Sequence, residues 1–271
     1  MSTTASEGVQ PGEPLAPAPQ EAMPQESQAS DIKRLQCELL QARAELDDFT
    51  YSVSHDLRAS LRHVSAYAQI IQEDLGERLT PDIAAHLATV QQAAKQMTRQ
   101  IEGLTELSRL TRMDLQLTRL DVGQLLRDVV TAMAPALQGR VVHWQVAQDI
   151  PALQGDAVLI RQVLMHLLPN AVKFTAHRAV AEIQITWQTH ASGLCALTIT
   201  DNGAGFNPQY KDKLFHAFGR LHGAREFEGL GMGLALTRKI VERHGGVVWA
   251  NAAPDAGCSV NFTLPLAQTV N

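Results

Sequence analysis

A histidine followed directly by an acidic residue, His55-Asp56, is the first place in this sequence where chemistry could occur. A neutral imidazole can attack a phosphorus atom, and the ordinary pKa of histidine leaves much of it neutral near pH 7. Asp56 could orient the ring or accept its proton. Val53 and Leu57 belong to an apolar seam, so His55 should project from the solvent-facing side of a helix. By itself, an exposed helical histidine is usually only a surface residue.

Two other segments carry side chains suited to a nucleotide. Asn170 and Lys173 lie one turn apart on an amphipathic helix, where the amide oxygen could bind Mg²⁺ and the ammonium group could meet phosphate oxygens. Asp201 follows a β-rich segment directly, and a carboxylate there can accept a hydrogen bond from an adenine amino group. Taken separately, each segment is equally compatible with an ordinary helix end or a turn.

Five glycines lie where the backbone could approach a ligand closely. The first two follow Asp201, and the other three lead into an amphipathic helix, whose bare N–H groups would suit a polyphosphate. Their spacing is neither the GxGxxG of a dinucleotide fold nor a P-loop. The five are Gly203, Gly205, Gly229, Gly231 and Gly233.

Apolar residues at alternating spacings of three and four predict two long helices, joined by a turn between Gly76 and Asp82. Each helix carries an apolar stripe that one hairpin leaves incomplete, so we predict a homodimer in which two hairpins form a four-helix bundle. The two series are Leu57, Leu61, Val64, Ala68, Ile71 and Leu75, then Ile83, Leu87, Val90, Ala94, Met97, Ile101 and Leu104. A coiled-coil seam precedes the first series and consists of Ile32, Leu35, Leu39, Ala42, Leu46, Phe49 and Val53.

From about residue 115 the pattern is mixed. Strands are predicted near 116–120, 141–146, 180–189, 194–200, 247–251 and 258–264, and helices at about 121–137, 156–172 and 232–244. Because strands and helices do not alternate strictly, we expect an α/β sandwich with helices on one face of a mixed sheet. The predicted fold class is therefore a dimerising helical hairpin followed by an α/β domain. The predicted domains are a disordered leader (1–30), a coiled coil and hairpin (31–114), the α/β domain (115–266) and a tail (267–271).

Charge, hydropathy and cysteine content limit the possible partners and location of the protein. The formal net charge is -5, so no basic field favours nucleic acid. No signal peptide and no run long enough for a spanning helix is present, which predicts a cytoplasmic protein without membrane insertion. The three cysteines show no CxxC or metal-ligand spacing, as expected in a reducing compartment.

Together, in this order and spacing, five segments resemble the boxes of the histidine kinases of two-component systems. The resemblance covers about residues 31–266, and the stretch from Phe218 to Trp249 is most similar to phytochrome-like kinases. The segments are Ser54-His55-Asp56-Leu57-Arg58 (histidine box), Asn170-Ala-Val-Lys173-Phe174 (N box), Asp201-Asn-Gly203-Ala-Gly205-Phe206 (first glycine box), Lys213-Leu-Phe215-His-Ala-Phe218 (F box) and Gly229-Leu-Gly231-Met-Gly233 (second glycine box).

The resemblance implies a histidine-phosphotransfer hairpin followed by a Bergerat-type ATP-binding domain that uses ATP and Mg²⁺. It implies that His55 is the phosphoacceptor and Asp56 its acid/base neighbour. Asn170 would hold Mg²⁺, Lys173 would meet phosphate, and Asp201 would read adenine. The five glycines would shape the pocket and a lid over about 216–230. The phosphoryl group would pass to an aspartate of a response regulator receiver domain. No sensor module is recognisable, so a separate sensor protein could supply the input.

Four residues depart from the family's pattern. Ser60 replaces the proline common five residues after the acceptor, so a milder helix kink is expected there. His166 replaces a second asparagine, which is expected to weaken Mg²⁺ binding or alter its pH dependence. Ala59 replaces a Thr or Asn that positions water in dual-function relatives, which predicts weak phosphatase activity. Leu230 replaces a small polar lid residue and should lose a phosphate contact. The alternatives are a degenerate kinase-fold adaptor and a Bergerat-fold ATPase that phosphorylates no histidine.

Overall fold

The computed structural model describes residues 25–137, 139–221, 223, 226–227 and 229–268. Its first helix, α1, starts at Gln25, so the last six residues of the expected leader are helical. These residues contain neither Pro nor Gly, and nothing in them stops the helix. The rest of the leader and the last three residues of the tail lie outside the described residues. The expected domain boundaries stay predictions.

The elements follow one another in the order expected for a hairpin and an α/β domain. They are α1 (Gln25–Leu75), η1 (Gly76–Arg78), α2 (Pro81–Arg112), β1 (Thr118–Leu120), α3 (Val122–Met133), η2 (Ala134–Leu137), β2 (Val142–Val146), β3 (Leu153–Gly155), α4 (Ala157–Phe174), β4 (Ala181–Thr189), β5 (Leu194–Asp201), η3 (Pro208–Lys213), α5 (Gly233–Arg243), β6 (Val248–Ala252) and β7 (Cys258–Pro265).

The part of α1 up to Asp48 forms a compact unit separate from residues 49–271. Within this first unit the helix exposes apolar side chains at the spacing of the predicted coiled-coil seam, namely Ile32, Leu35, Leu39 and Leu46. A surface ion pair joins Arg34 to Asp31 along the same helix. An exposed apolar row on a long helix is the surface that a second helix would cover.

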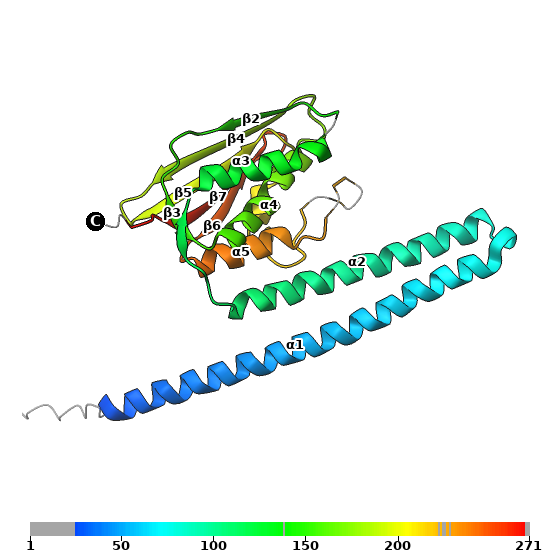
Figure 1. Ribbon diagram of the computed structural model, residues 1–271, viewed down its shortest axis with the longest axis horizontal. Coiled ribbons are helices and arrows are strands. Elements are labelled where there is room, and N and C mark those ends of the chain that lie inside the picture. The colour runs from blue at the N-terminus through cyan, green and yellow to red at the C-terminus, as the bar shows by residue number, and fades with distance from the viewer. Residues whose placement is uncertain (1–24, 138, 222, 224–225, 228, 269–271) are drawn as a thin grey trace, which may run out of the picture. The chain divides into compact units, whose positions relative to one another are not determined.

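The turn between α1 and α2 forms where the sequence predicted it. Thr80 caps α2 by accepting a hydrogen bond from the backbone N–H of Ile83, and Pro81 occupies the first helical position. Proline at this position needs no N–H, and its fixed φ suits the first turn. In Figure 1 the two helices run side by side in opposite directions.

Each heptad series of the hairpin divides into two rows. On one side Leu61 of α1 packs with Ala94 and Ile101 of α2 in a buried cluster. On the other side, residues seven positions apart are between 37% and 49% exposed. A two-helix hairpin can cover only one apolar row per helix, so the second row is left open. The open row consists of Leu57, Val64 and Ile71 on α1 and Ile83, Val90, Met97 and Leu104 on α2.

This division corrects one detail at the acceptor segment. Val53 and Leu57 were expected to be buried, but both are exposed within a single chain. Ser54 and Leu61 are buried instead. His55 is nevertheless exposed, as predicted, because it faces away from the buried row.

The α/β domain contains a five-stranded sheet in the order β2-β4-β5-β7-β6. The β2–β4 pair is parallel and the other pairs are antiparallel, so the sheet is mixed as expected. Figure 1 shows α3, α4 and α5 together on one face of it. The predicted strand near 116–120 lies outside this sheet, because β1 pairs with β3. The sequence did not predict β3, which at three residues is too short for a period-two pattern.

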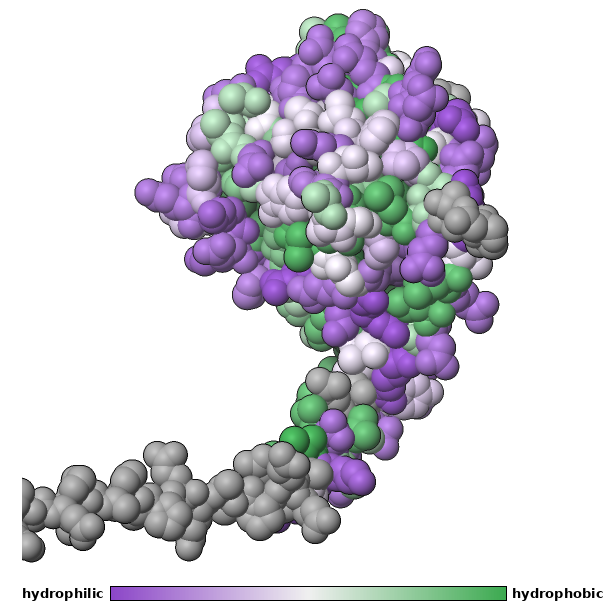
Figure 2. Space-filling model, turned by 90° about the vertical axis from the view of Figure 1, so that its left-hand side faces the viewer, coloured by the Kyte–Doolittle hydropathy of each residue, from purple (hydrophilic) through white to green (hydrophobic). Residues whose placement is uncertain are grey.

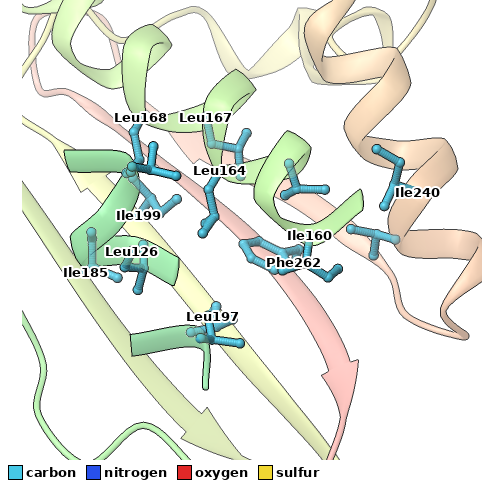
Figure 3. Packing of buried hydrophobic residues seen from close by; sticks show 14 of the residues in the cluster. Leu126, Ile160, Leu164, Leu167, Leu168, Ile185, Leu197, Ile199, Ile240 and Phe262 are labelled. Atoms are coloured by element: carbon cyan, nitrogen blue, oxygen red, sulfur yellow. The ribbon is translucent and has the colours of Figure 1, made fainter. Parts of the chain in front are cut away.

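The core of the domain lies between the helices and the sheet. Figure 3 shows Leu164 and Leu168 of α4 directed toward the sheet, where Ile199 and Phe262 meet them. All four side chains are at least 97% buried. At about 25 cal/mol per Å² of apolar surface, each contributes roughly 1.5–3 kcal/mol to folding.

Helix α4 is held at both of its ends. At the start, the Asp156 carboxylate accepts hydrogen bonds from the N–H groups of Val158 and Leu159. The N–H of Asp156 donates to Nε2 of His244, which follows α5. At the far end, the Arg140 guanidinium donates to the carbonyl oxygens of Val172 and Thr175. These contacts fix the axial position of the helix that carries Asn170 and Lys173.

Hydrophobic side chains on the surface of the α/β domain are dispersed. On the face seen in Figure 2 they form small groups separated by hydrophilic residues. No helix among the described residues has the length and apolar character needed to cross a membrane.

The hairpin ends inside the core of the α/β domain, because Leu110 of α2 is fully buried there. Leu110→Ala should therefore lower the free energy of unfolding of that domain by about 2–4 kcal/mol. Urea unfolding followed by fluorescence would report on this domain, since all three tryptophans lie in its strands. Leu117→Ala, at a half-exposed leucine nearby, should change the value by less than about 1 kcal/mol. Equal effects of the two substitutions would contradict this assignment.

Candidate functional site

A cavity of about 440 Å³ opens in the α/β domain beside the start of α5. Seven of the eight residues predicted to bind nucleotide line it, although they come from three separate segments. They are Asn170, Lys173, Asp201, Gly205, Gly229, Gly231 and Gly233. The eighth, Gly203, does not line the cavity but donates its N–H to the Asp201 carboxylate at 2.8 Å. The α/β fold thus brings the predicted residues together.

The lining of the cavity includes a buried carboxylate. Asp201 ends β5, and burial raises its pKa to about 6, opposed by hydrogen bonds from the N–H groups of Gly203 and Cys258. Ile199 and Val260 add apolar walls beside it. Burial and the nearby carboxylate raise the pKa of the Cys258 thiol to about 12, so the thiol stays protonated. The carboxylate thus offers one hydrogen-bond acceptor in an apolar setting.

The glycines after Asp201 are required by close packing. A Cβ on Gly203 would lie 2.6 Å from the carbonyl oxygen of Phe174. Gly205 has a φ of 59°, and a Cβ there would overlap the carbonyl oxygen of Ala253. These two residues therefore shape the loop that holds Asp201 at the cavity.

The lining of the cavity also includes cationic side chains. Lys173 donates from Nζ to Oδ1 of Asn170 at 2.9 Å, and its ammonium group lies 4.4 Å from the centre of the Phe174 ring. Burial lowers the pKa of Lys173, and the positive charge of Arg220 lowers it further. The amide oxygen predicted to bind Mg²⁺ is thus occupied by the lysine predicted to bind phosphate.

Arg220 is a residue of the cavity that the sequence did not single out. Its guanidinium donates to the carbonyl oxygens of Gly229 and Phe227 at 2.8 and 2.7 Å. Phe227 is buried and packs edge-on against Phe174, with ring centres 5.0 Å apart. Arg220 therefore holds the returning part of the predicted lid, of which residues 222, 224–225 and 228 lie outside the described residues. It lies in a segment without helical or strand periodicity, so no pattern marked it.

His166 lies on α4 one turn before Asn170 and also lines the cavity. Its Nε2 is buried and has no hydrogen-bond partner within the described part of the chain. Burial lowers the pKa of His166, although the Glu106 carboxylate of α2 acts in the opposite direction. The ring fills its space tightly, because a Cβ on Gly233 would lie 3.2 Å from Nδ1. The imidazole is therefore a neutral group in the lining of the cavity.

The hairpin also reaches the cavity. Arg99 and Gly103 of α2 line it, and α2 packs against α5. A Cβ on Gly103 would lie 2.8 Å from Cγ of Met232, so only glycine allows this approach. A glycine inside a long helix was the one signal in the sequence that could have predicted the contact.

The donor set for a divalent cation is sparse. The described residues hold no cluster of three or more His, Cys, Asp or Glu side chains suited to a metal. Asn170 offers one amide oxygen, a ligand type that Mg²⁺ accepts beside phosphates and water. The residues fit Mg²⁺ that arrives with a nucleotide, and they do not form a separate metal cage.

The predicted acceptor lies on α1 and does not line the cavity. The His55 side chain is 65% exposed, and its Nδ1 lies 3.2 Å from Oδ1 of Asp56. A carboxylate can only accept a hydrogen bond, so the proton of the pair lies on Nδ1. The lone pair of Nε2 then remains free toward solvent.

Two family models match the chain in the same order as these two sites. Residues 45–112 match the His Kinase A (phospho-acceptor) domain. Residues 155–268 match the histidine kinase-, DNA gyrase B- and HSP90-like ATPase. The chain belongs to the histidine kinase family. The match to both models identifies the family, since the second model alone also covers other ATPases.

Several histidine kinases and phytochromes are similar to the chain. Cyanobacterial phytochrome B of Nostoc sp. is 30% identical over 237 residues, which cover 87% of this chain and 31% of the phytochrome. The adaptive-response sensory kinase SasA of Synechocystis sp. is 30% identical over 246 residues, covering 87% of this chain and 63% of SasA. The chain thus spans about a third of the phytochrome's length and under two thirds of SasA.

Solved structures show the same fold. Full-length ShkA in complex with AMPPNP matches with a TM-score of 0.61 at 24% identity, covering 83% of this chain and 47% of ShkA. The histidine kinase ThkA in complex with the response regulator TrrA matches with a TM-score of 0.58 at 18% identity, covering 86% of this chain and 66% of that one. The predicted helical hairpin and the α/β domain with a mixed sheet are confirmed, while dimerisation of the hairpin stays a prediction.

Asp201→Asn should abolish ATP binding while leaving this histidine kinase at least as stable as before. The raised pKa means that the folded state holds the proton more tightly than the unfolded state, so stability falls as pH rises from about 4 to about 6. At neutral pH the ionised carboxylate is unfavourable by at most about 3 kcal/mol, which the amide removes. Calorimetric ATP titration and urea unfolding would measure the two effects.

In the wild type, ATP affinity should decrease as the pH falls through about 6, because the protonated carboxyl is a poorer acceptor. Asp212→Asn, at an exposed acid of η3, should alter neither affinity nor stability. Wild-type affinity for ATP in Asp201→Asn would refute the role of Asp201.

Proposed function

We propose that this chain is an ATP-dependent protein-histidine kinase that phosphorylates its own His55. The observation that carries the proposal is the pairing, in one chain, of the cavity around Asp201 with the exposed His55-Asp56 pair. A nucleotide site alone would suit an ATPase, and an exposed histidine alone would be a surface residue.

The residues that line the cavity suit both parts of ATP, the adenine ring and the phosphates. The Asp201 carboxylate would accept a hydrogen bond from the adenine amino group, and the adjacent apolar walls would enclose the ring. Lys173 and Arg220 would neutralise the phosphates, and the backbone N–H groups at the start of α5 would add donors. Gly229, Gly231 and Gly233 line the cavity at this point and bring the backbone close to it.

The cation would be Mg²⁺, held by Asn170 together with the phosphates and water. Mg²⁺ bound there would supply charge neutralisation between the terminal phosphates. Lys173 now donates to the same Asn170 oxygen, and a turn of its ammonium group toward the phosphates would remove a positive charge from beside the cation. His166 leaves the site with one amide fewer than the family pattern. This supports the expectation of weakened or pH-dependent Mg²⁺ binding.

The acceptor chemistry follows from the His55 tautomer. Nε2 would attack the γ-phosphorus, forming an N–P bond as the bond between that phosphorus and the bridging oxygen breaks and ADP leaves. The Nδ1 proton would pass to Asp56, which already lies at hydrogen-bonding distance. Because both residues are exposed on a rigid helix, they can reach a nucleotide without unfolding.

The phosphoryl group would then pass to an aspartate of a response regulator receiver domain. The ThkA–TrrA complex, a kinase of the same fold with its regulator, supports this partner. Ala59 carries neither a hydroxyl nor an amide to position water, so we expect weak phosphatase activity toward that regulator. A separate sensor protein and a cytoplasmic location remain parts of the proposal.

Incubation with γ-labelled ATP and Mg²⁺ would test the proposal directly. The wild type should acquire label that is labile in acid and stable in alkali, as a phosphohistidine is. His55→Gln should abolish the label by removing the nucleophile, and Asp201→Asn by removing nucleotide. His63→Gln, at another exposed histidine of α1, is the matched control and should label normally. ATP hydrolysis without label would favour the Bergerat-fold ATPase, and ATP binding without either reaction would favour the adaptor.

The open row of the hairpin supports a homodimer, since seven regularly spaced apolar side chains would be covered by a second copy. Val90→Glu combined with Met97→Glu should raise the dimer dissociation constant at least about tenfold, because charges would enter the covered row. Light scattering after size-exclusion chromatography would measure it. Gln92→Glu, at an exposed position of the same helix, should leave the dimer intact. A dimer that survives the double substitution would require a different interface.

A further inference from the structure

Helices α2 and α5 run in the same direction where they meet. Gly103 of α2 lies at Met232, just before α5, and Arg243 at the end of α5 donates to the carbonyl oxygen of Leu110. Moving back along α2 from Gly103 therefore leads past the N-terminal end of α5. Arg99 lies one turn back, about 6 Å farther along the axis.

The N-terminal end of α5 is suited to an anion. No side chain caps it, since Met232 at the cap position forms no side-chain hydrogen bond. Its first N–H groups therefore need an outside acceptor, and the helix dipole adds positive potential there. Gly231 and Gly233 line the cavity at this point. Lys173 and Arg220 line the same cavity.

Arg99 carries the third cation of the cavity lining. It forms no hydrogen bond or ion pair with any residue that the structure describes, although it lines the cavity. Arg109, on the same helix, is instead bound by both oxygens of Glu106 at 2.8 Å. Among the described lining residues Asp201 is the sole acid, and it ends β5. The lining thus holds three cationic side chains and one acidic side chain, so its positive charge exceeds what the protein itself neutralises.

We propose that Arg99 of the hairpin binds the terminal phosphates of a nucleotide held by the α/β domain. The inference rests on the proposed ATP site and adds a residue from a different part of the chain. A guanidinium can donate two parallel hydrogen bonds to phosphate oxygens, which suits this position beyond the helix end. A triphosphate would then contact both α2 and α5, whereas adenosine monophosphate would contact the α/β domain alone.

The test is equilibrium binding of AMPPNP, ADP and AMP with Mg²⁺ to the full chain, by titration calorimetry. Arg99→Ala should weaken AMPPNP about tenfold, ADP less, and AMP not at all. Arg99→Lys should restore part of the loss, because the charge returns without the planar fork. Lys95→Ala removes a cation one turn earlier on α2, outside the lining, and should leave all three affinities unchanged.

Hydrogen exchange gives a second readout. AMPPNP should protect backbone amides around residues 99–103 in the wild type and not in Arg99→Ala. Equal loss for all three nucleotides, or no loss for AMPPNP, would overturn the inference. If AMPPNP binding depends on Arg99 while His55 never acquires label, the kinase proposal fails and the Arg99 contact stands. If His55 acquires label while Arg99→Ala binds AMPPNP with unchanged affinity, the kinase proposal stands and the Arg99 contact fails.

Discussion

The nucleotide cavity depends on how α4 is held. One face of this helix is buried against the sheet, while its last turns present His166, Asn170 and Lys173 to the cavity. Asp156 fixes the start of the helix and Arg140 its end. Since a close-packed core deforms little, these three side chains keep a common frame. Any shift of α4 would displace all three side chains together, so the position of the site residues depends on the packing of the core.

The cavity collects charged side chains. Its lining combines one buried carboxylate with three cationic side chains, an arrangement that folding alone would not favour. The raised pKa of Asp201 and the lowered pKa of Lys173 both show that the ionised forms are disfavoured by burial. Such unfavourable groups persist in folded proteins mainly at functional sites. A ligand with an amino group at one end and anionic oxygens at the other would relieve both.

Local patterns predicted most of the architecture. Heptad spacing predicted both hairpin helices, and Thr80-Pro81 marked the turn. Asp121 indeed caps α3, as its position before an apolar helix indicated. The short β3 strand escaped, because three residues carry no periodicity. Heptad spacing also does not predict which apolar row a single hairpin buries, since both rows have the same spacing and similar side chains.

Residues of the cavity lining could be predicted where they belong to local sequence motifs. They could not be predicted where contacts between distant parts of the chain bring them to the cavity. The glycine boxes, Asn170 and Asp201 could be identified from residue type and local context. Arg220 and Arg99 could not, since Arg220 bonds to carbonyl groups across a loop and Arg99 lies on α2, outside the α/β domain. Gly103, a glycine inside a long helix, was the one sequence signal for the contact of α2 with the cavity. The neutral state of His166 likewise depends on burial, which no single segment of sequence determines.

The two points at which α2 meets the α/β domain differ in kind. Leu110 is inserted in the core, whereas Gly103 allows α2 to approach the buried side chain of Met232. Met232 belongs to the same core and also lines the cavity. A rotation of α2 would therefore act on the core and on the nucleotide cavity together, so the hairpin and the cavity are mechanically coupled.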